Sequence, residues 1–78
     1  MPTVLVIGPY RFFFYSNEYG EPPHIHVQRD TAVAKFWLAP VALARSRGFA
    51  AQELTRISRL VMDNRELFEE RWHEHFGR

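Results

Sequence analysis

The sequence predicts an α+β fold, an antiparallel meander of four or five short strands followed by one long or two consecutive C-terminal helices packed on one face. Over the first half of the chain, short β-branched and aromatic segments alternate with turn residues. From Ala50 onward, apolar residues recur at the helical period. A chain of 78 residues has room for one hydrophobic core, so residues 1–78 are expected to form a single domain.

Two strands are predicted before the first long loop. Residues 3–7 are mostly β-branched or apolar and precede a Gly-Pro turn signal. Residues 10–16 have the aromatic enrichment of a strand that is buried on much of both faces. Residues 16–23 are expected to form a polar loop, and Pro22-Pro23 hold its end extended because each ring fixes a backbone angle.

A hairpin and a fifth strand complete the predicted sheet. Residues 24–29 and 32–38 each alternate in side-chain character, and Asp30-Thr31 between them suits a tight turn. Residues 41–46 are expected to form a fifth short strand, with a helical turn as the alternative.

The last third of the chain is predicted to be helical. Asp63 and Asn64 are poor helix formers and good caps, so the segment either continues as one helix or divides there into two. Gly77 is expected to end it. One apolar stripe faces the sheet, formed by Leu54, Ile57, Val61, Phe68 and Trp72 and broadened by Leu60, Leu67 and Phe76.

Composition excludes several classes of protein. Hydrophobic residues make up 46% and aromatic residues 15% of the chain, which is too rich in large apolar groups for a disordered protein. The absence of cysteine excludes disulfides, thiolate metal sites and a cysteine nucleophile, and it suits a reducing compartment. A net charge of +1 gives no global attraction to nucleic acid, and no segment resembles a signal peptide or a membrane span. We therefore expect a cytoplasmic protein without membrane contact.

Strand alternation assigns the side chains to two faces of the sheet. The helix-covered face is expected to hold Phe12, Phe14, Ile25, Val27, Ala34, Phe36 and Leu38. The opposite face should expose an unusual mixture of aromatic, cationic and histidine side chains. The predicted binding face there comprises Arg11, Phe13, Tyr15, His24, His26, Lys35 and Trp37, with Gln28 and Val33 beside them.

His24 and His26 form the most informative pair on that face. Side chains two apart on a strand point the same way, so both rings should share one small surface. Such a pair is most often solvated or has a structural role. A ribonuclease is one alternative, in which the two imidazoles transfer protons while Arg11 or Lys35 holds phosphate charge. A non-catalytic face that stacks RNA bases on its aromatic rings is another, so enzymatic activity stays open.

The same two histidines could share a divalent ion if a third ligand joined them. His73 and Glu21 are candidates from other segments. The motif around His73 and His75 is a weaker signal, because side chains two apart on a helix diverge. We expect no metal and no other cofactor, and a divalent-metal-binding protein using His24, His26 and His73 is kept as an alternative.

Five segments of the chain are recognisable together: Tyr10–Glu18, Glu21–Val27, Ala34–Leu38, Arg47–Phe49 and Trp72–Gly77. They resemble the small bacterial domain-of-unknown-function 4160 family across essentially the whole chain. The resemblance implies a short prokaryotic cytoplasmic protein, commonly encoded beside a second small protein in an arrangement like a toxin-antitoxin pair. It implies no chemistry. The positions that match the family pattern are Arg11, His24, His26, Lys35, Trp37 and His73.

Two positions depart from that family's pattern. Members tend to have a small polar residue where this chain has Ala50, and that residue would form a capping box with Glu53. The first helix is therefore expected to begin without a side-chain cap. An aromatic residue is more usual at the position of His75, which weakens the case for a metal site on both terminal histidines.

An interaction module is the leading hypothesis from the sequence. The protein would act as one member of a toxin-antitoxin-like pair through its predicted binding face. The expected partner is the small protein encoded by the neighbouring gene, and a homodimer and RNA are the alternatives.

Overall fold

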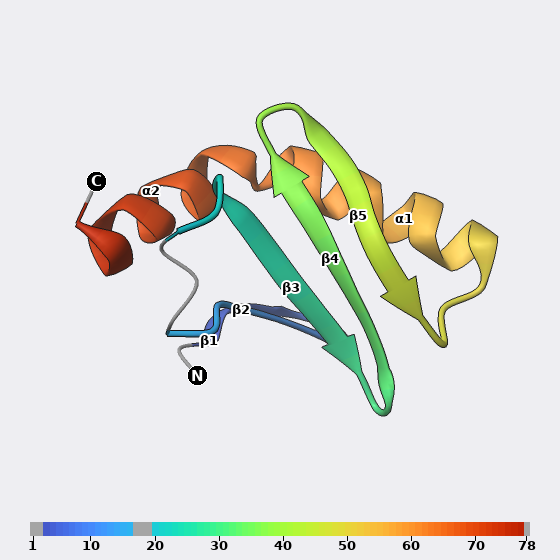
Figure 1. Cartoon of the computed structure of the whole chain (residues 1–78). Helices are drawn as coiled ribbons and strands as arrows, with labels where there is room; N and C mark the ends of the chain where they lie inside the picture. The colour runs from blue at the N-terminus through green and yellow to red at the C-terminus, as the bar shows by residue number, and fades with distance from the viewer. Residues whose placement is uncertain (1–2, 17–19, 78) are drawn as a thin grey trace.

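The computed structural model describes residues 3–16 and 20–77, which form five strands and two helices. The elements are β1 (Thr3–Ile7), β2 (Tyr10–Phe13), β3 (His24–Arg29), β4 (Ala32–Leu38), β5 (Val41–Arg47), α1 (Ala51–Asp63) and α2 (Arg65–Phe76). The strands form one antiparallel sheet in chain order, with both helices on one face (Figure 1). Within the described residues, no helix is long and apolar enough to cross a membrane. The predicted α+β meander, with two consecutive helices, is confirmed.

The strands differ from the predicted ones at two ends. β2 ends at Phe13 instead of residue 16, because its pairing with β3 stops where Phe13 meets His26. β5 extends one residue further than predicted, to Arg47, and the helical-turn alternative for this segment is wrong. Residues 17–19 of the predicted polar loop lie outside the described residues.

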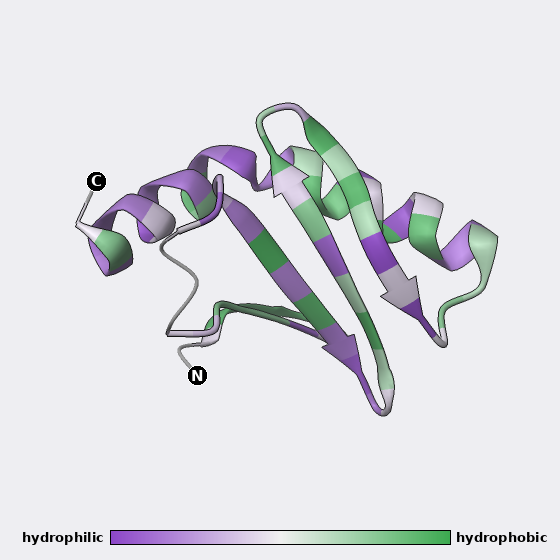
Figure 2. Ribbon diagram, in the orientation of Figure 1, coloured by the Kyte–Doolittle hydropathy of each residue, from purple (hydrophilic) through white to green (hydrophobic). Residues whose placement is uncertain are grey.

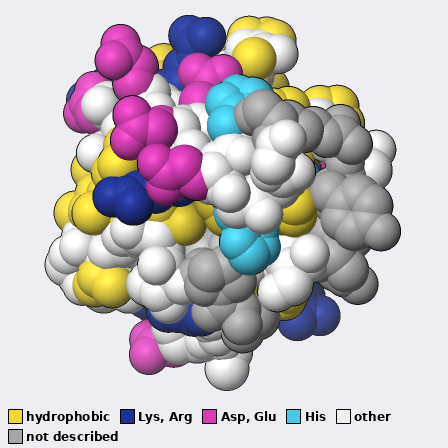
Figure 3. Space-filling view, turned by 90° about the vertical axis from the view of Figure 1, so that its left-hand side faces the viewer, with side chains coloured by type: hydrophobic (Ala, Val, Ile, Leu, Met, Phe, Trp, Pro, Cys, Tyr) yellow, Lys and Arg dark blue, Asp and Glu magenta, His cyan; other side chains and the backbone are white. Residues whose placement is uncertain are grey.

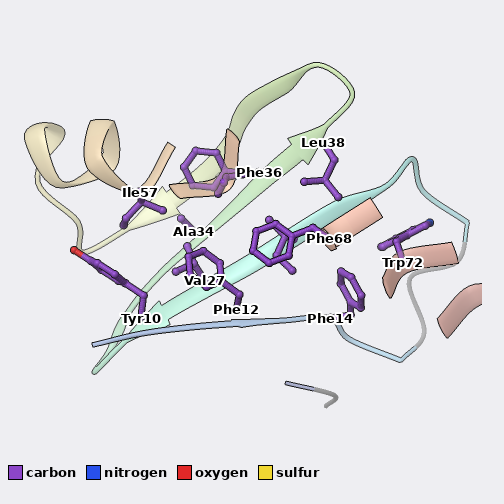
Figure 4. Close-up of a cluster of buried hydrophobic side chains, with 12 residues drawn as sticks. Tyr10, Phe12, Phe14, Val27, Ala34, Phe36, Leu38, Ile57, Phe68 and Trp72 are labelled. Carbon is purple, nitrogen blue, oxygen red and sulfur yellow. The ribbon is translucent and has the colours of Figure 1, made fainter. Parts of the chain in front are cut away.

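The hydrophobic core lies between the sheet and the helices. Hydrophilic and hydrophobic residues alternate along the first four residues of β3 (Figure 2). The hydrophobic ones, Ile25 and Val27, belong to the core beneath the helices. Phe14 meets Trp72 edge-on with ring centres 5.3 Å apart, and Phe12 lies 5.2 Å from Phe68 (Figure 4). The predicted core residues of the sheet are confirmed, and so are Ile57, Val61, Phe68 and Trp72 of the helices. Leu54, Leu60 and Phe76 pack against the core half-buried, whereas Leu67 does not belong to it. The buried cluster contains Tyr10, Phe12, Phe14, Ile25, Val27, Ala34, Phe36, Leu38, Ile57, Val61, Phe68 and Trp72.

Asn64 lies at the junction of the two helices, where the sequence predicts a possible division, but its side chain does not cap α2. Its backbone N–H donates to the Leu60 carbonyl at 3.1 Å, and its side-chain amide donates to the same oxygen at 2.9 Å. Its own carbonyl accepts from the Phe68 N–H at 3.0 Å, which begins α2. Gly77 ends α2 with a φ of 72°, a left-handed conformation that glycine adopts without steric cost.

Glu53 connects α1 to the sheet through side-chain hydrogen bonds and takes no part in capping the helix. Ala50 gives α1 no side-chain cap, as expected. Arg29 donates from Nε and Nη2 to the two Glu53 oxygens at 2.7 and 2.9 Å, and the Tyr10 hydroxyl donates at 2.8 Å. Donors favour the charged carboxylate, so the hydrogen bonds from Arg29 and then Tyr10 lower the pKa of Glu53 below its usual 4.5.

Candidate functional site

The candidate site lies on the sheet face opposite the helices, which we call the far face. Strand register places its side chains in three rows that run across the sheet. The first row is Thr3, Phe13, His26, Lys35 and Arg45, the second is Val6, Arg11, Gln28, Val33 and Arg47, and the third is His24, Trp37 and Ala42. Residues far apart in the sequence therefore become direct cross-strand neighbours.

The first row is a packed series of aromatic and cationic groups. The His26 ring stacks on Phe13 with ring centres 5.5 Å apart, and Tyr15 lies edge-on to His26 at 4.6 Å. Lys35 forms an ion pair with Glu21. Tyr15 and Glu21 both belong to the connection between β2 and β3, so this connection covers part of the far face.

This cover buries more of the far face than the sequence suggested. The exposed fraction is 2% for Phe13, 6% for His26 and 5% for Lys35, whereas Tyr15 remains 39% exposed. The expectation that this face exposes its aromatic and histidine side chains is therefore wrong for several of them. The physical reason is that two side chains of the connection contact the sheet: Tyr15, predicted as part of the strand over residues 10–16, and Glu21, predicted in the polar loop.

His24 is a buried residue that packs at one end of the sheet. Its Nδ1–H donates to the Pro22 carbonyl at 2.9 Å, and its ring centre lies 4.7 Å from that of Trp72. The neighbouring Pro23 carbonyl accepts from the Leu38 N–H at 3.1 Å. Because His24 has no exposed surface, it cannot contact a substrate. The structure therefore does not support the two-histidine ribonuclease, which needs both rings at the scissile phosphate.

An open pocket of about 340 Å³ lies over the β4–β5 half of the far face. Cationic and aromatic groups dominate its lining, and they are Phe13, Tyr15, His26, Lys35, Arg45 and Arg47. Arg45 and Arg47 are exposed, and neither pairs with a carboxylate within residues 3–16 and 20–77. Guanidinium groups beside aromatic rings suit an anionic ligand that also has an apolar or planar part.

A β-bulge in β5 directs the two arginines into this pocket, which we call the cationic pocket. Phe36 pairs with Leu43 but Lys35 pairs with Arg45, so Ala44 is an additional residue in the ladder. Before the bulge, Leu43 shares the helix side of the sheet with Phe36. After the bulge, Arg45 shares the far face with Lys35. Arg47, two residues further along the strand, faces the same side because side chains alternate along a strand.

The predicted binding face is assembled only in part. Phe13, Tyr15, His26 and Lys35 line the cationic pocket. Arg11 lies on the far face outside it, with its guanidinium 4.4 Å from the centre of the Phe13 ring. Trp37 lies in the third row, where its ring centre is 4.6 Å from the Lys35 ammonium and it borders an apolar hollow beside the prolines. Arg45 and Arg47 were not predicted as site residues.

The alternative metal site does not assemble. His73 is exposed on α2, whereas His24 is buried against the sheet. Across the two described ranges, no three His, Cys, Asp or Glu residues lie close enough together to hold an ion. The three histidines therefore do not form a coordination site.

Charge is distributed unequally between the two layers of the molecule. β5 contributes Arg45 and Arg47 and contains no acidic residue. α2 contains four glutamates and two arginines. Figure 3 shows acidic side chains gathered on the helical side, at the end where α2 terminates. The cationic pocket and the acidic residues of α2 therefore belong to different sides of the protein.

The comparisons with known proteins gave one match. The model of a family described as domain of unknown function (DUF4160) matches residues 10–73. The matched range runs from β2 into α2 and includes every residue of the cationic pocket. No curated protein and no solved structure matches the chain.

Proposed function

We infer the function from the geometry and charge of the cationic pocket. This chain belongs to the DUF4160 family, but the description of that family names no activity. We propose that the protein is a cytoplasmic interaction module and one member of a prokaryotic toxin-antitoxin-like pair. Its partner is a small protein, encoded by the neighbouring gene, that places an acidic segment in the cationic pocket. The observation that supports this most is the pair Arg45 and Arg47, exposed and without carboxylate partners in the described residues.

The composition of the pocket suits a protein partner. Arginine and tyrosine are enriched in protein interfaces and carry much of their binding energy. Arg45 and Arg47 can each receive a carboxylate through two parallel hydrogen bonds. Tyr15 supplies an exposed aromatic surface beside them. The acidic residues of α2 lie on the other layer and do not occupy these arginines.

Co-expression with the neighbouring gene product tests the proposal. The two proteins should elute together in size-exclusion chromatography at micromolar concentration, and Arg45→Gln with Arg47→Gln should separate them. The matched control is Arg56→Gln with Arg71→Gln, which removes the same charge from the helical layer and should leave the complex intact. Separate elution of the wild-type proteins would contradict the proposal, as would equal effects of the two double variants.

A growth assay tests the toxin-antitoxin part of the proposal separately. Expression of one member alone should arrest growth, and expression of both should restore it. If neither protein alone slows growth, the complex is an ordinary assembly and the toxin-antitoxin assignment fails.

RNA binding is the second candidate function, favoured by the aromatic rings in the cationic pocket. Tyr15 is exposed there beside His26, and single-stranded bases stack on such rings while arginines contact phosphate. Titration of fluorescent single-stranded RNA at two salt concentrations measures this directly. Binding that falls with salt and is lost in the Arg45→Gln, Arg47→Gln variant would support RNA as the ligand.

A further inference from the structure

β5 forms one edge of the sheet and pairs only with β4 (Figure 1). An edge strand presents backbone N–H and C=O groups that can pair with another extended chain. Six of its seven residues are exposed. The edge is therefore accessible along most of its length.

A groove of about 270 Å³ runs beside this edge, between β5 and α1. Its most exposed apolar residues are Leu43 and Met62, at 45% and 54%, and Phe36 and Leu54 lie deeper in it. Arg59 stands at its border. A side chain projecting toward the helices from a strand added to β5 would enter this groove.

The bulge at Ala44 divides β5 into two chemically different halves. The first half is hydrophobic and the second is hydrophilic (Figure 2). Leu43 faces the groove, whereas Arg45 and Arg47 face the cationic pocket on the other side of the sheet. One edge thus offers an apolar contact on its helix side and two cations on its far side.

We propose that the edge of β5 is a strand-addition site for an extended, acidic segment of a partner protein. Side chains alternate along a strand, so the segment has apolar residues toward the groove and carboxylates toward the two arginines. This inference deepens the proposed function and rests on it for the partner's identity. It adds that the partner binds through backbone hydrogen bonds to β5 as well as through ion pairs with the two arginines.

Charge favours a partner over a second copy of this chain. A second β5 strand carries two arginines and no acidic residue, so it offers no carboxylate to Arg45 and Arg47. Cations on edge strands commonly prevent such self-pairing. The same cations attract a carboxylate-bearing strand, so they discriminate between the two occupants.

A synthetic peptide tests the site without the natural partner. The probe is a capped peptide of alternating valine and glutamate, about seven residues long, which is the length of a typical strand. Amide hydrogen exchange of the full chain is measured with and without the peptide. The expected result is slower exchange in residues 41–47 and no change in residues 3–7, which form the other edge.

Two variants and a control locate the contact. Leu43→Lys and Met62→Lys should each weaken peptide binding about tenfold, which equals about 1.4 kcal/mol, because both obstruct the groove. Val6→Lys introduces the same side chain at an exposed position of β1, the other edge strand, and should leave binding unchanged. A peptide of alternating valine and lysine should not bind.

The possible outcomes separate this inference from the proposed function. Absent protection of residues 41–47, protection elsewhere, or equal binding of the acidic and basic peptides would overturn the strand-addition site. Concentration-dependent protection of the same residues without peptide would show a second copy as the occupant and would also overturn it. Protection by the acidic peptide, together with failure of the neighbouring gene product to bind, would retain the site and reject the proposed partner.

Discussion

The two faces of the sheet differ in how completely they are covered: the helices bury one face, whereas the far face is buried at its centre and exposed toward both edge strands. Toward the helices, apolar residues such as Phe12 and Val27 pack against Phe68 and Ile57 with no exposed surface. On the far face, Tyr15 and Glu21 of the β2–β3 connection contact the middle of the first row, at His26 and Lys35. The helix-covered face is a continuous apolar core, whereas the far face combines burial with charge.

This difference shows that side-chain polarity indicates which face a residue occupies but not how exposed it is. Lys35 is as well buried as Tyr10, although one bears a charge on the far face and the other belongs to the core. A buried charge needs a partner, and the ion pair with Glu21 supplies one. The helix-covered face should therefore be sensitive to lost volume, and the far face to lost charge pairing.

Loss of volume from the helix-covered face should have the largest effect. Phe68→Ala removes a fully buried ring that packs on Phe12, and such truncations cost about 3–5 kcal/mol. Small domains have a total stability of about 5–15 kcal/mol, so much of the cooperative unfolding transition in urea should be lost. Met62→Ala, at an exposed position of α1, should change the midpoint little. Similar midpoints for both variants would contradict the assignment of this core.

Breaking the far-face ion pair should have the next largest effect and should be asymmetric. Glu21→Gln leaves the buried Lys35 ammonium without its carboxylate and should reduce the free energy of unfolding by about 2 kcal/mol. Lys35→Met leaves a more exposed carboxylate that water can solvate, so its cost should be below about 1 kcal/mol. Urea denaturation of both variants measures the two values. A larger loss for Lys35→Met would contradict this asymmetry, because methionine retains an apolar stem of similar length and removes only the ammonium.

Low pH should weaken the hydrogen bonds of Glu53 with Arg29 and Tyr10, which connect α1 to the sheet. The pKa of Glu53 is lowered in the folded protein by Arg29 and Tyr10, so its contribution is complete above the usual value of 4.5. The contribution is lost as the pH falls through the lower, folded-state pKa. Glu53→Gln should therefore be less stable than the wild type at about pH 7, and the difference should shrink at about pH 3. Thermal unfolding at both pH values measures it, and a constant difference would argue against this carboxylate as the titrating group.

The smallest expected effect is a gain of stability in the helical layer. Ala50 has the extended backbone of a capping residue but no side-chain hydrogen bond. Ala50→Ser should stabilise the protein by about 0.5–1 kcal/mol, because its hydroxyl can accept a free N–H of the first turn. Ala50→Val, which adds no hydrogen-bonding group, is the control and should give no comparable gain in melting temperature. Peptide binding at β5 should be the same in both variants.

Several features of this protein could be predicted from its sequence. Alternation in β3 and β4 identified the core residues on the helix-covered face, and the helical spacing of Ile57, Val61 and Phe68 identified the surface that covers them. Asn64 indicated the junction of the helices. These features are local, because strand and helix periods and capping preferences are properties of short segments.

The candidate site could be predicted only in part. Alternation counted from Leu43 would place Arg45 and Arg47 on the helix side, and only the bulge at Ala44 turns them to the far face. The burial of His26 likewise depends on Tyr15, which reaches it from the β2–β3 connection.

The sequence by itself determined which segments form strands and which form helices, the apolar face of the sheet and most residues of the core. The tertiary structure alone decided which cations gather in the cationic pocket and that His24 and His26 are both buried. The physical reason is that hydrophobic periodicity is encoded locally, whereas register shifts and the packing of connections depend on contacts between segments distant in the chain.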